Sequence, residues 1–340
     1  MSRFTLTTPI PTDRAGLRAA GWLHRRMVRI AMLIIGIVGL SPFSRAQPPI
    51  TALTFAPDDS SLVAASQAGI EVASWPALET LQKRSVGIAH VHDLKFSPDG
   101  ERLLIVGGAG SEYGKWKLVS WPDFEVIATK ISHADVIHSA VWLSNEQFVT
   151  GAADNDLIEW QVANGGAEVR VIHGHSRRVL CVETMDEQSL LVSAGIDQVL
   201  KVWNCKDGIV AEQPLRNLDN HTGAVRDLAV RPGDHAVPYL ASASVDKTVR
   251  LWQPSIGRLV RFARLPAEPT SLAWSRDGER LAVGGAGGKL RIINPHNVEI
   301  EQTFDGIDGW IFEVASAGDG SFAVGGTGGV IKRVIPTIGP

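Results

Sequence analysis

Three segments of the chain repeat one pattern, two short runs of alternating residues separated by a polar turn. One copy is residues 240–252, LASASVDKTVRLW, and the others are residues 191–203 and 148–160. Alternation of apolar and polar residues predicts half-buried strands, and the polar residues between the runs predict a hairpin turn. The chain therefore reuses one small antiparallel unit.

Four side-chain types recur at fixed positions in each copy. A hydroxyl residue stands four positions before an aspartate, the aspartate stands six before a tryptophan, and a histidine lies upstream. This pattern resembles the WD40 repeat family, whose structural tetrad links these four types, although the usual Trp-Asp dipeptide is here Trp-Asn or Trp-Gln. The three sets are His133, Thr150, Asp154 and Trp160; His175, Ser193, Asp197 and Trp203; and His221, Ser242, Asp246 and Trp252.

Similar units extend over most of the chain. Strand-end positions recur every 39 to 49 residues, at Trp75, Trp121, Trp160, Trp203, Trp252, Ile293 and Val334. A period of about 40 to 50 residues indicates propeller blades. With 34 glycines and 10 tryptophans, the chain is predicted to be all-β. The resemblance implies a seven-bladed WD40-like β-propeller with four-stranded antiparallel blades over residues 47–340.

Both ends of that region are rich in proline. Residues 47–49 are Gln-Pro-Pro, and residues 336–340 begin and end with proline. Because proline has no N–H to donate to a strand ladder, neither end makes a good outer strand. We expect the last blade to lack a regular fourth strand.

Residues 1–46 have the features of a signal peptide or a short membrane anchor. Residues 1–29 carry six arginines against one acid, residues 30–40 are apolar, and small residues at 44 and 46 offer a cleavage site after Ala46. This pattern predicts a secretory signal peptide, and hence a periplasmic or secreted protein. One alternative is an uncleaved membrane anchor through residues 27–43, although its uncharged run is short of the ~20 residues that a spanning helix needs. Another is a buried strand in a cytoplasmic protein.

Charge and motifs argue against several functions. The chain has 33 basic and 36 acidic residues, and cleavage after Ala46 would leave 26 and 35, a net charge of −9. Such a domain lacks the positive charge that attracts nucleic acid. The sequence has no haem-attachment motif and no phosphate-binding loop, and its histidines lack the spacing of a zinc site. We expect no cofactor, no metal and no nucleic-acid partner.

The recurring histidine, hydroxyl and aspartate could be mistaken for a catalytic triad. Nucleophilic catalysis needs one exposed nucleophile beside its base. A set that recurs at the same place in three units is instead expected of a buried hydrogen-bonded brace. We therefore predict no catalytic residues.

The resemblance implies a rigid ring whose loops bind proteins or peptides. We predict a non-enzymatic interaction scaffold that acts outside the cytoplasm. One alternative is a propeller enzyme that acts on a small molecule at the central channel, and another is a membrane-anchored structural subunit of an envelope complex. A partner-binding face is expected where the inner strands begin, although its residues could also be ordinary solvated charges; they are Arg178, Arg226, Asp93 and Asp227.

Overall fold

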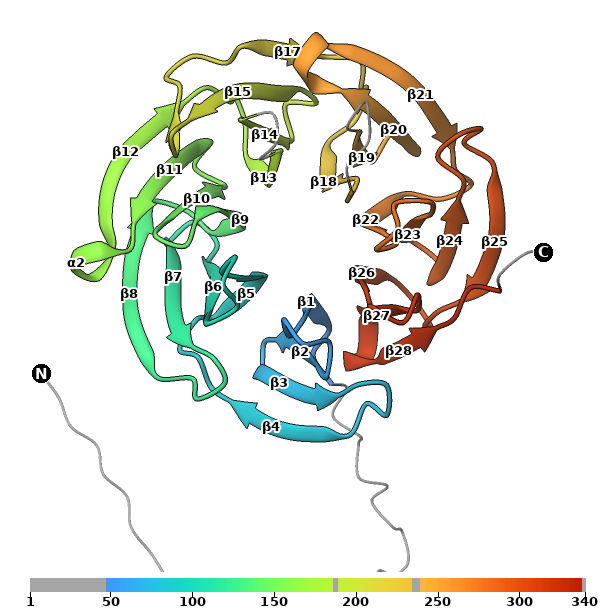
Figure 1. Ribbon diagram of the computed structural model, residues 1–340, viewed down its shortest axis with the longest axis horizontal. Helices are drawn as coiled ribbons and strands as arrows, with labels where there is room; N and C mark the ends of the chain where they lie inside the picture. The colour runs from blue at the N-terminus through green and yellow to red at the C-terminus, as the bar shows by residue number, and fades with distance from the viewer. Residues whose placement is uncertain (1–46, 186–188, 234–238, 338–340) are drawn as a thin grey trace, which may run out of the picture. The chain divides into compact units, whose positions relative to one another are not determined.

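The structure, a computed structural model, describes residues 47–185, 189–233 and 239–337. Within these ranges, seven antiparallel sheets form a ring, and the first strand of each sheet faces the centre (Figure 1). The all-β seven-bladed fold predicted from the repeats is confirmed. The signal peptide or anchor predicted for residues 1–46, with its possible membrane segment at 27–43, lies outside the described residues.

Each blade starts with its innermost strand and proceeds outward. In blades 1 to 3 the strands are β1 (Ile50–Phe55), β2 (Ser61–Ser66), β3 (Gly69–Ser74) and β4 (Thr80–Arg84); β5 (His90–Phe96), β6 (Arg102–Ala109), β7 (Tyr113–Ser120) and β8 (Val126–His133); and β9 (Ile137–Ser144), β10 (Gln147–Ala152), β11 (Asp156–Gln161) and β12 (Ala167–His173). In blades 4 and 5 they are β13 (Val179–Met185), β14 (Leu190–Gly195), β15 (Leu200–Lys206), β16 (Ile209–Val210) and β17 (Arg216–Leu218); and β18 (Val225–Val230), β19 (Leu240–Ser244), β20 (Thr248–Gln253) and β21 (Arg258–Arg264). In blades 6 and 7 they are β22 (Pro269–Trp274), β23 (Leu281–Gly285), β24 (Lys289–Ile293) and β25 (Ile300–Asp305); and β26 (Ile311–Ser316), β27 (Phe322–Gly326) and β28 (Ile331–Val334).

The helical elements in the described ranges are single turns. They are α2 (Ala163–Gly166), η2 (Pro254–Ile256) and η3 (Thr327–Gly329). In the part of the chain that the structure describes, no helix has the length and apolarity needed to cross a membrane.

Two blades depart from the four-stranded pattern. In blade 4, the last residues of β15 pair with the short β16, and the first half of β15 pairs with β17. In blade 7, the described residues form only three strands, β26, β27 and β28. This agrees with the expectation of an incomplete last blade.

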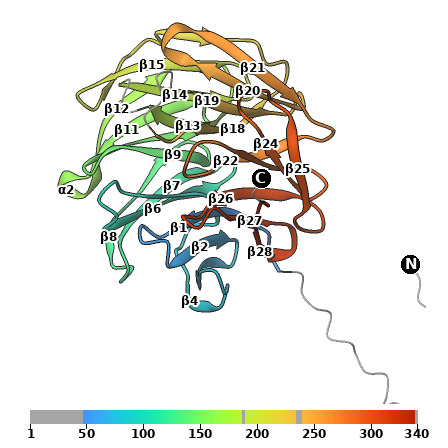
Figure 2. The ribbon, with the colours of Figure 1, turned by 45° about the vertical axis from the view of Figure 1, so that its right-hand side comes forward.

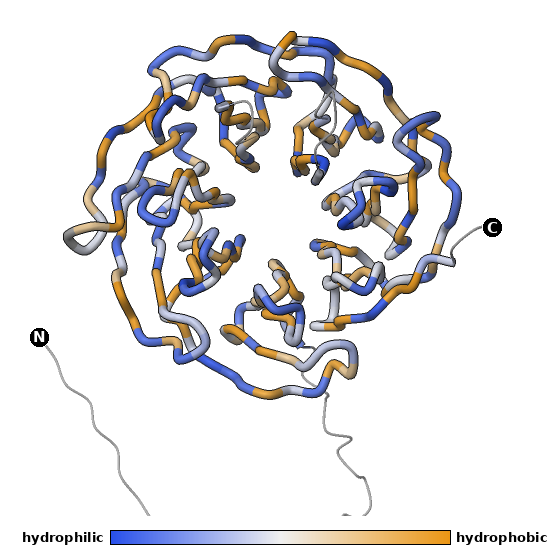
Figure 3. The backbone as a smooth tube through the Cα atoms, viewed as in Figure 1, coloured by the Kyte–Doolittle hydropathy of each residue, from blue (hydrophilic) through white to orange (hydrophobic). Residues whose placement is uncertain are grey.

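The second strand of a blade is covered on both faces by the neighbouring blades. Every residue of β14, β19, β23 and β27 is buried. These strands were expected to be half-buried, but burial on both faces favours continuous runs of small and apolar residues instead. The outer strands do alternate between hydrophilic and hydrophobic residues (Figure 3) and lie on the perimeter in both views (Figures 1 and 2).

Close packing between blades 7 and 1 closes the ring. A Cβ on Gly325 of β27 would lie 2.7 Å from Ile50 Cγ2 and 2.9 Å from Leu53 Cδ1, both on β1. Gly151 makes the same approach to Val179 in the next blade, where a Cβ would lie 2.7 Å from Cγ1. The last seam therefore has the same packing as an internal seam, although blade 7 has three described strands.

The strand-end positions assigned to blades 1 and 2 were wrong by two residues. In blade 3, Phe148 is the second residue of β10 and pairs with Trp160. The residues at the same place in blades 1 and 2 are Leu62 and Leu103, and they pair with Ala73 and Val119, two residues before Trp75 and Trp121. Trp75 and Trp121 follow the strands, where they pack edge-on against Phe55 and Phe96 at 4.9 and 5.0 Å between ring centroids.

Candidate functional site

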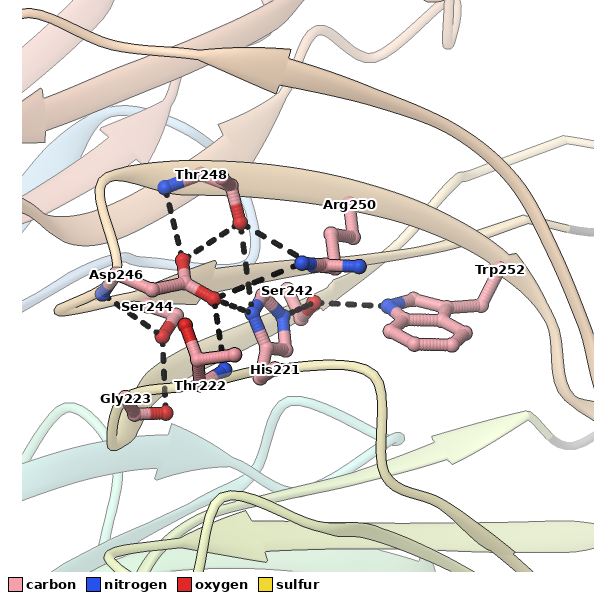
Figure 4. A network of polar contacts seen from close by, with 9 residues as sticks. All are labelled: His221, Thr222, Gly223, Ser242, Ser244, Asp246, Thr248, Arg250 and Trp252. Atoms are coloured by element: carbon pink, nitrogen blue, oxygen red, sulfur yellow. Dashed lines mark hydrogen bonds and ion pairs between the residues drawn. The ribbon is translucent and has the colours of Figure 1, made fainter.

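Blade 5 holds a continuous chain of hydrogen bonds (Figure 4). Trp252 Nε1 donates to Ser242 Oγ at 2.8 Å, and Ser242 Oγ lies 2.7 Å from His221 Nε2. His221 Nδ1 lies 2.7 Å from Asp246 Oδ2. With the histidine proton on Nδ1, every donor along this chain has one acceptor, and the chain ends on the carboxylate.

The same arrangement occurs in blades 3 and 4. The histidine–aspartate distance is 2.8 Å in both, and the tryptophan donates to the hydroxyl at 2.9 Å in both. The three hydroxyl residues have 0% exposure, so they cannot meet a substrate from solution; they are Thr150, Ser193 and Ser242. In each case the histidine precedes an inner strand, and the bonds fix it to the hairpin of the blade that this strand begins; His133 itself is the last residue of β8 in blade 2.

Asp246 receives further hydrogen bonds. Thr248 Oγ1 donates to it at 2.6 Å, and the Thr222 backbone N–H donates at 3.1 Å. Burial opposes ionisation, but the bonds from Thr248 and His221 outweigh it and lower the pKa of Asp246 to about 2. The carboxylate is therefore a fixed anionic end for the chain.

A second feature faces the centre of the ring. Each inner strand has a β-bulge near its first residues, so that one residue is skipped in its pairing with the second strand. A bulge redirects side chains. All seven skipped residues line one cavity of about 420 Å³. We call them the mouth ring: Thr51, His92, His138, Leu180, Arg226, Thr270 and Phe312.

The mouth ring combines basic, aromatic and hydroxyl groups. The Arg226 side chain is 41% exposed and lies 3.9 Å from the Glu268 carboxylate. Phe312 is 36% exposed and stacks on Trp310. The His92 and His138 rings meet edge-on at 5.0 Å. Burial lowers the pKa of His92. Burial also lowers the pKa of His138, and the neighbouring His92 and Arg178 lower it further, to about 4. Both histidines are therefore neutral at pH 7.

Two of the predicted binding residues are tied into the ring. Asp93 Oδ2 accepts a hydrogen bond from the Ala140 N–H of the next blade at 3.0 Å. Asp227 Oδ2 accepts one from the Leu272 N–H, also in the next blade, at 2.6 Å. Both carboxylates thus join neighbouring blades, although both also line the cavity. Arg178 is exposed immediately before β13, and Arg226 belongs to the mouth ring.

Deeper in the channel, one lysine lies among several carboxyl groups. Lys95 Nζ is 3.0 Å from Glu183 Oε1. Burial raises the pKa of Glu183 and Glu313, and raises that of Asp227 to about 7. Among the residues described, no group of three or more His, Cys, Asp or Glu side chains is placed to hold a metal ion.

Sequence reasoning missed most of the mouth ring. His92, His138 and Phe312 lie on different blades and share no residue type. The available signal was positional: each directly precedes the polar residue at the same place of its inner strand, Asp93, Ser139 and Glu313. A bulge is defined by the pairing between two strands, and the sequence of one strand does not show it. The shared position of the seven residues becomes visible only when the inner strands of the units are aligned.

Comparison with known proteins identifies repeats in three places. A family model described as "WD domain, G-beta repeat" matches residues 166–204, 212–253 and 264–294. Protein HIR1 of Cryptococcus neoformans is 28% identical over 229 residues, which cover 58% of this chain and 25% of that protein. Cell division cycle 20.1, cofactor of APC complex, of Arabidopsis thaliana is 27% identical over 196 residues, or 56% of this chain and 41% of that protein. The protein transport protein sec13 of Aspergillus oryzae is 32% identical over 110 residues, or 31% and 37%. The chain thus spans well under half the length of these relatives.

These comparisons correct the predicted location. The plant relatives include a cell division cycle protein named as a cofactor of the APC complex and a subunit of the THO complex, and the fungal relatives include Protein HIR1 and the protein transport protein sec13. None of these names describes an exported or membrane-anchored protein. The prediction of a periplasmic, secreted or membrane-anchored protein was therefore wrong. It rested on residues 1–46 alone.

Proposed function

Because the chain is a WD40-repeat β-propeller, we propose that it is a non-enzymatic protein-interaction scaffold that binds a segment of a partner protein over the mouth of its channel. The observation that carries this proposal is the convergence of seven bulge side chains, one from each blade, on a single cavity. The blades supply the stability, so these positions are free to vary with the partner.

The composition of the mouth ring suits a peptide segment. Arginine and aromatic residues are enriched where proteins bind each other, because they combine a large contact area with directional polar groups. Arg226 and the stacked pair Trp310 and Phe312 provide both at one rim. Arg178 adds an exposed positive charge near the start of β13.

Two further observations support a scaffold. The hydroxyls of the three histidine–aspartate sets are buried, which leaves those sets without an exposed nucleophile. In addition, two matched relatives are named as a cofactor of the APC complex and a subunit of the THO complex, names that describe members of protein assemblies.

Affinity capture with matched variants tests the proposal. Wild type, R226E, F312A and R276E would be immobilised and exposed to extract of the native host. Arg276 is exposed in the hairpin turn after β22, at the opposite end of the inner strands from the bulges. We expect R226E and F312A to lose a partner that wild type and R276E retain. Equal capture by all four proteins, or a loss confined to R276E, would remove the mouth from consideration.

A further inference from the structure

The outer strand of blade 5 carries an unbalanced positive charge. β21 has arginines at 258, 261 and 264, and all three are exposed. Between Lys247 and Arg264 the chain has five basic residues and no acidic one, although the whole chain has more acidic than basic residues. We call the five the basic strip: Lys247, Arg250, Arg258, Arg261 and Arg264.

The basic strip surrounds an exposed aromatic ring. Phe262 is 44% exposed. The guanidinium carbons of Arg250 and Arg264 lie 5.5 and 5.9 Å from the centre of its ring, within the range of a cation–π contact. Lys247 lies beside Arg264, since its carbonyl oxygen accepts the Leu265 N–H at 2.8 Å. The strip therefore offers both charge and apolar surface.

The charges of β21 are not neutralised within the blade. Among the described residues, no carboxylate lies within ion-pair distance of Arg258, Arg261 or Arg264. Within the strip, Arg250 does have a carboxylate nearby, that of Asp246 at 3.7 Å, but this carboxylate is already bonded to His221 and Thr248. Clustered charges of one sign repel each other, so the arrangement costs stability unless a partner offsets it.

The same strand is a free sheet edge. In the part of the chain that is described, β21 pairs only with β20, and it lies on the perimeter of the ring (Figure 1). In an antiparallel sheet, alternate residues of an edge strand direct their N–H and C=O groups away from the sheet. These groups can pair with an added strand, as in other peptide-binding domains.

Edge charges can also serve to prevent strand pairing. In some other blades, a charged residue on the outer strand is ion-paired within the blade, so that its charge is balanced there. On β4 of blade 1, Lys83 is ion-paired with Glu71 at 3.2 Å. On β25 of blade 6, Asp305 is paired with Lys289. The basic strip differs because, among the described residues, Arg258, Arg261 and Arg264 have no such partners, which favours an external acidic group.

We propose that the outer edge of β21 binds an extended acidic segment of a partner protein as an additional strand. Glutamate or aspartate side chains of that segment would pair with Arg264 on the face of β21 that carries Phe262, and with Arg261 on the opposite face. An apolar side chain would cover Phe262, and a further acidic side chain would pair with Arg258. Arginine suits this role because its planar guanidinium binds carboxylates through two parallel hydrogen bonds. This surface is separate from the mouth ring.

Fluorescence anisotropy with defined peptides tests the proposal. The probe is a fluorescein-labelled ten-residue peptide in which pairs of glutamates alternate with pairs of valines, so that both faces of the added strand carry glutamate and valine. The variant is R261S/R264S. The matched control is K83S/R84S, which removes two positive charges from β4, the outer strand of blade 1. Two probe controls are a peptide with prolines in place of two valines, which cannot form a regular strand, and a twenty-nucleotide single-stranded DNA. Thermal melting verifies that all proteins are folded.

We expect the glutamate–valine peptide to bind wild type and K83S/R84S equally, and R261S/R264S at least tenfold more weakly. The proline peptide should bind at least tenfold more weakly than the parent, and 500 mM NaCl should weaken binding because the contacts are ionic. The proposal fails if the peptide does not bind, if both double variants bind alike, or if the proline peptide or the DNA binds as well as the parent. Aggregation of R261S/R264S without peptide binding by wild type would show that the arginines only protect the edge.

Discussion

The His221 Nε2 and Ser242 Oγ atoms lie 2.7 Å apart in a site with almost no solvent exposure. The hydroxyl accepts from Trp252 and donates to His221, and the histidine donates to Asp246. Hydrogen bonds arranged in one direction polarise one another, so the loss of one member affects the others. This chain of hydrogen bonds fixes the segment before β18 to the hairpin of β19 and β20.

Replacing Ser242 with alanine should destabilise the propeller. The change leaves Trp252 Nε1 and His221 Nε2 buried without a partner. An unsatisfied buried group costs about 1–3 kcal/mol, so the two should cost roughly 2–6 kcal/mol and lower Tm by roughly 3–10 °C. T150A should behave alike, whereas T150S keeps the hydroxyl and should lose less than half as much. Similar melting curves for T150A and T150S would contradict a bracing role.

Acid should weaken the blade 5 brace at a defined pH. Hydrogen bonds hold the folded pKa of Asp246 at about 2, below its ordinary value of 3.8. A carboxyl with a depressed folded pKa stabilises the protein fully above the unfolded pKa, and this contribution is lost as the pH falls from about 4 to 2. In melting curves recorded from pH 5 to 2, the gap between wild type and D246N should narrow. A gap that stays constant would show that the charge of Asp246 is not used.

The channel lysine should matter more in alkali than in acid. Lys95 is the counter-charge of Glu183, and Asp93 and Asp227 also face it. Without Lys95, the ionised carboxylates repel each other at pH 8. At pH 5 they take up protons more readily, because burial raises the pKa of Glu183 and raises that of Asp227 to about 7. We therefore expect K95M to lower Tm more at pH 8 than at pH 5, and K95M/E183Q to recover part of the loss. The prediction is wrong if E183Q and K95M lower Tm additively at both pH values.

The seam between blades 7 and 1 should not tolerate a larger residue. A valine at position 325 would meet Ile50 and Leu53, since a Cβ alone would lie within 3 Å of both. Overpacking of this kind costs about 1–3 kcal/mol. The control is G110A, because a Cβ at Gly110 meets nothing within 4 Å. Equal melting temperatures for G325V and G110A would mean that this contact does not hold the ring closed.

The repeats in the sequence predicted the architecture because each unit carries its own local pattern. The spacing of Ser242, Asp246 and Trp252 within a single hairpin is such a pattern. The partners of Asp93 and Asp227 could not be predicted, because the Ala140 and Leu272 N–H groups belong to the next blade and lie 47 and 45 residues away. The mouth ring was missed for the same reason, since its members converge only when the ring closes.

Site-specific photo-crosslinking tests the proposed function most directly. p-Benzoylphenylalanine would be incorporated at position 180, in the mouth ring, and separately at position 101, in the exposed hairpin turn after β5. After irradiation in extract of the native host, crosslinked proteins would be quantified by mass spectrometry with an excess of unlabelled competitor. The account predicts that position 180 crosslinks to a partner, that wild type competes, and that F312A does not. Crosslinks of equal yield from position 101, or equal competition by F312A, would contradict it.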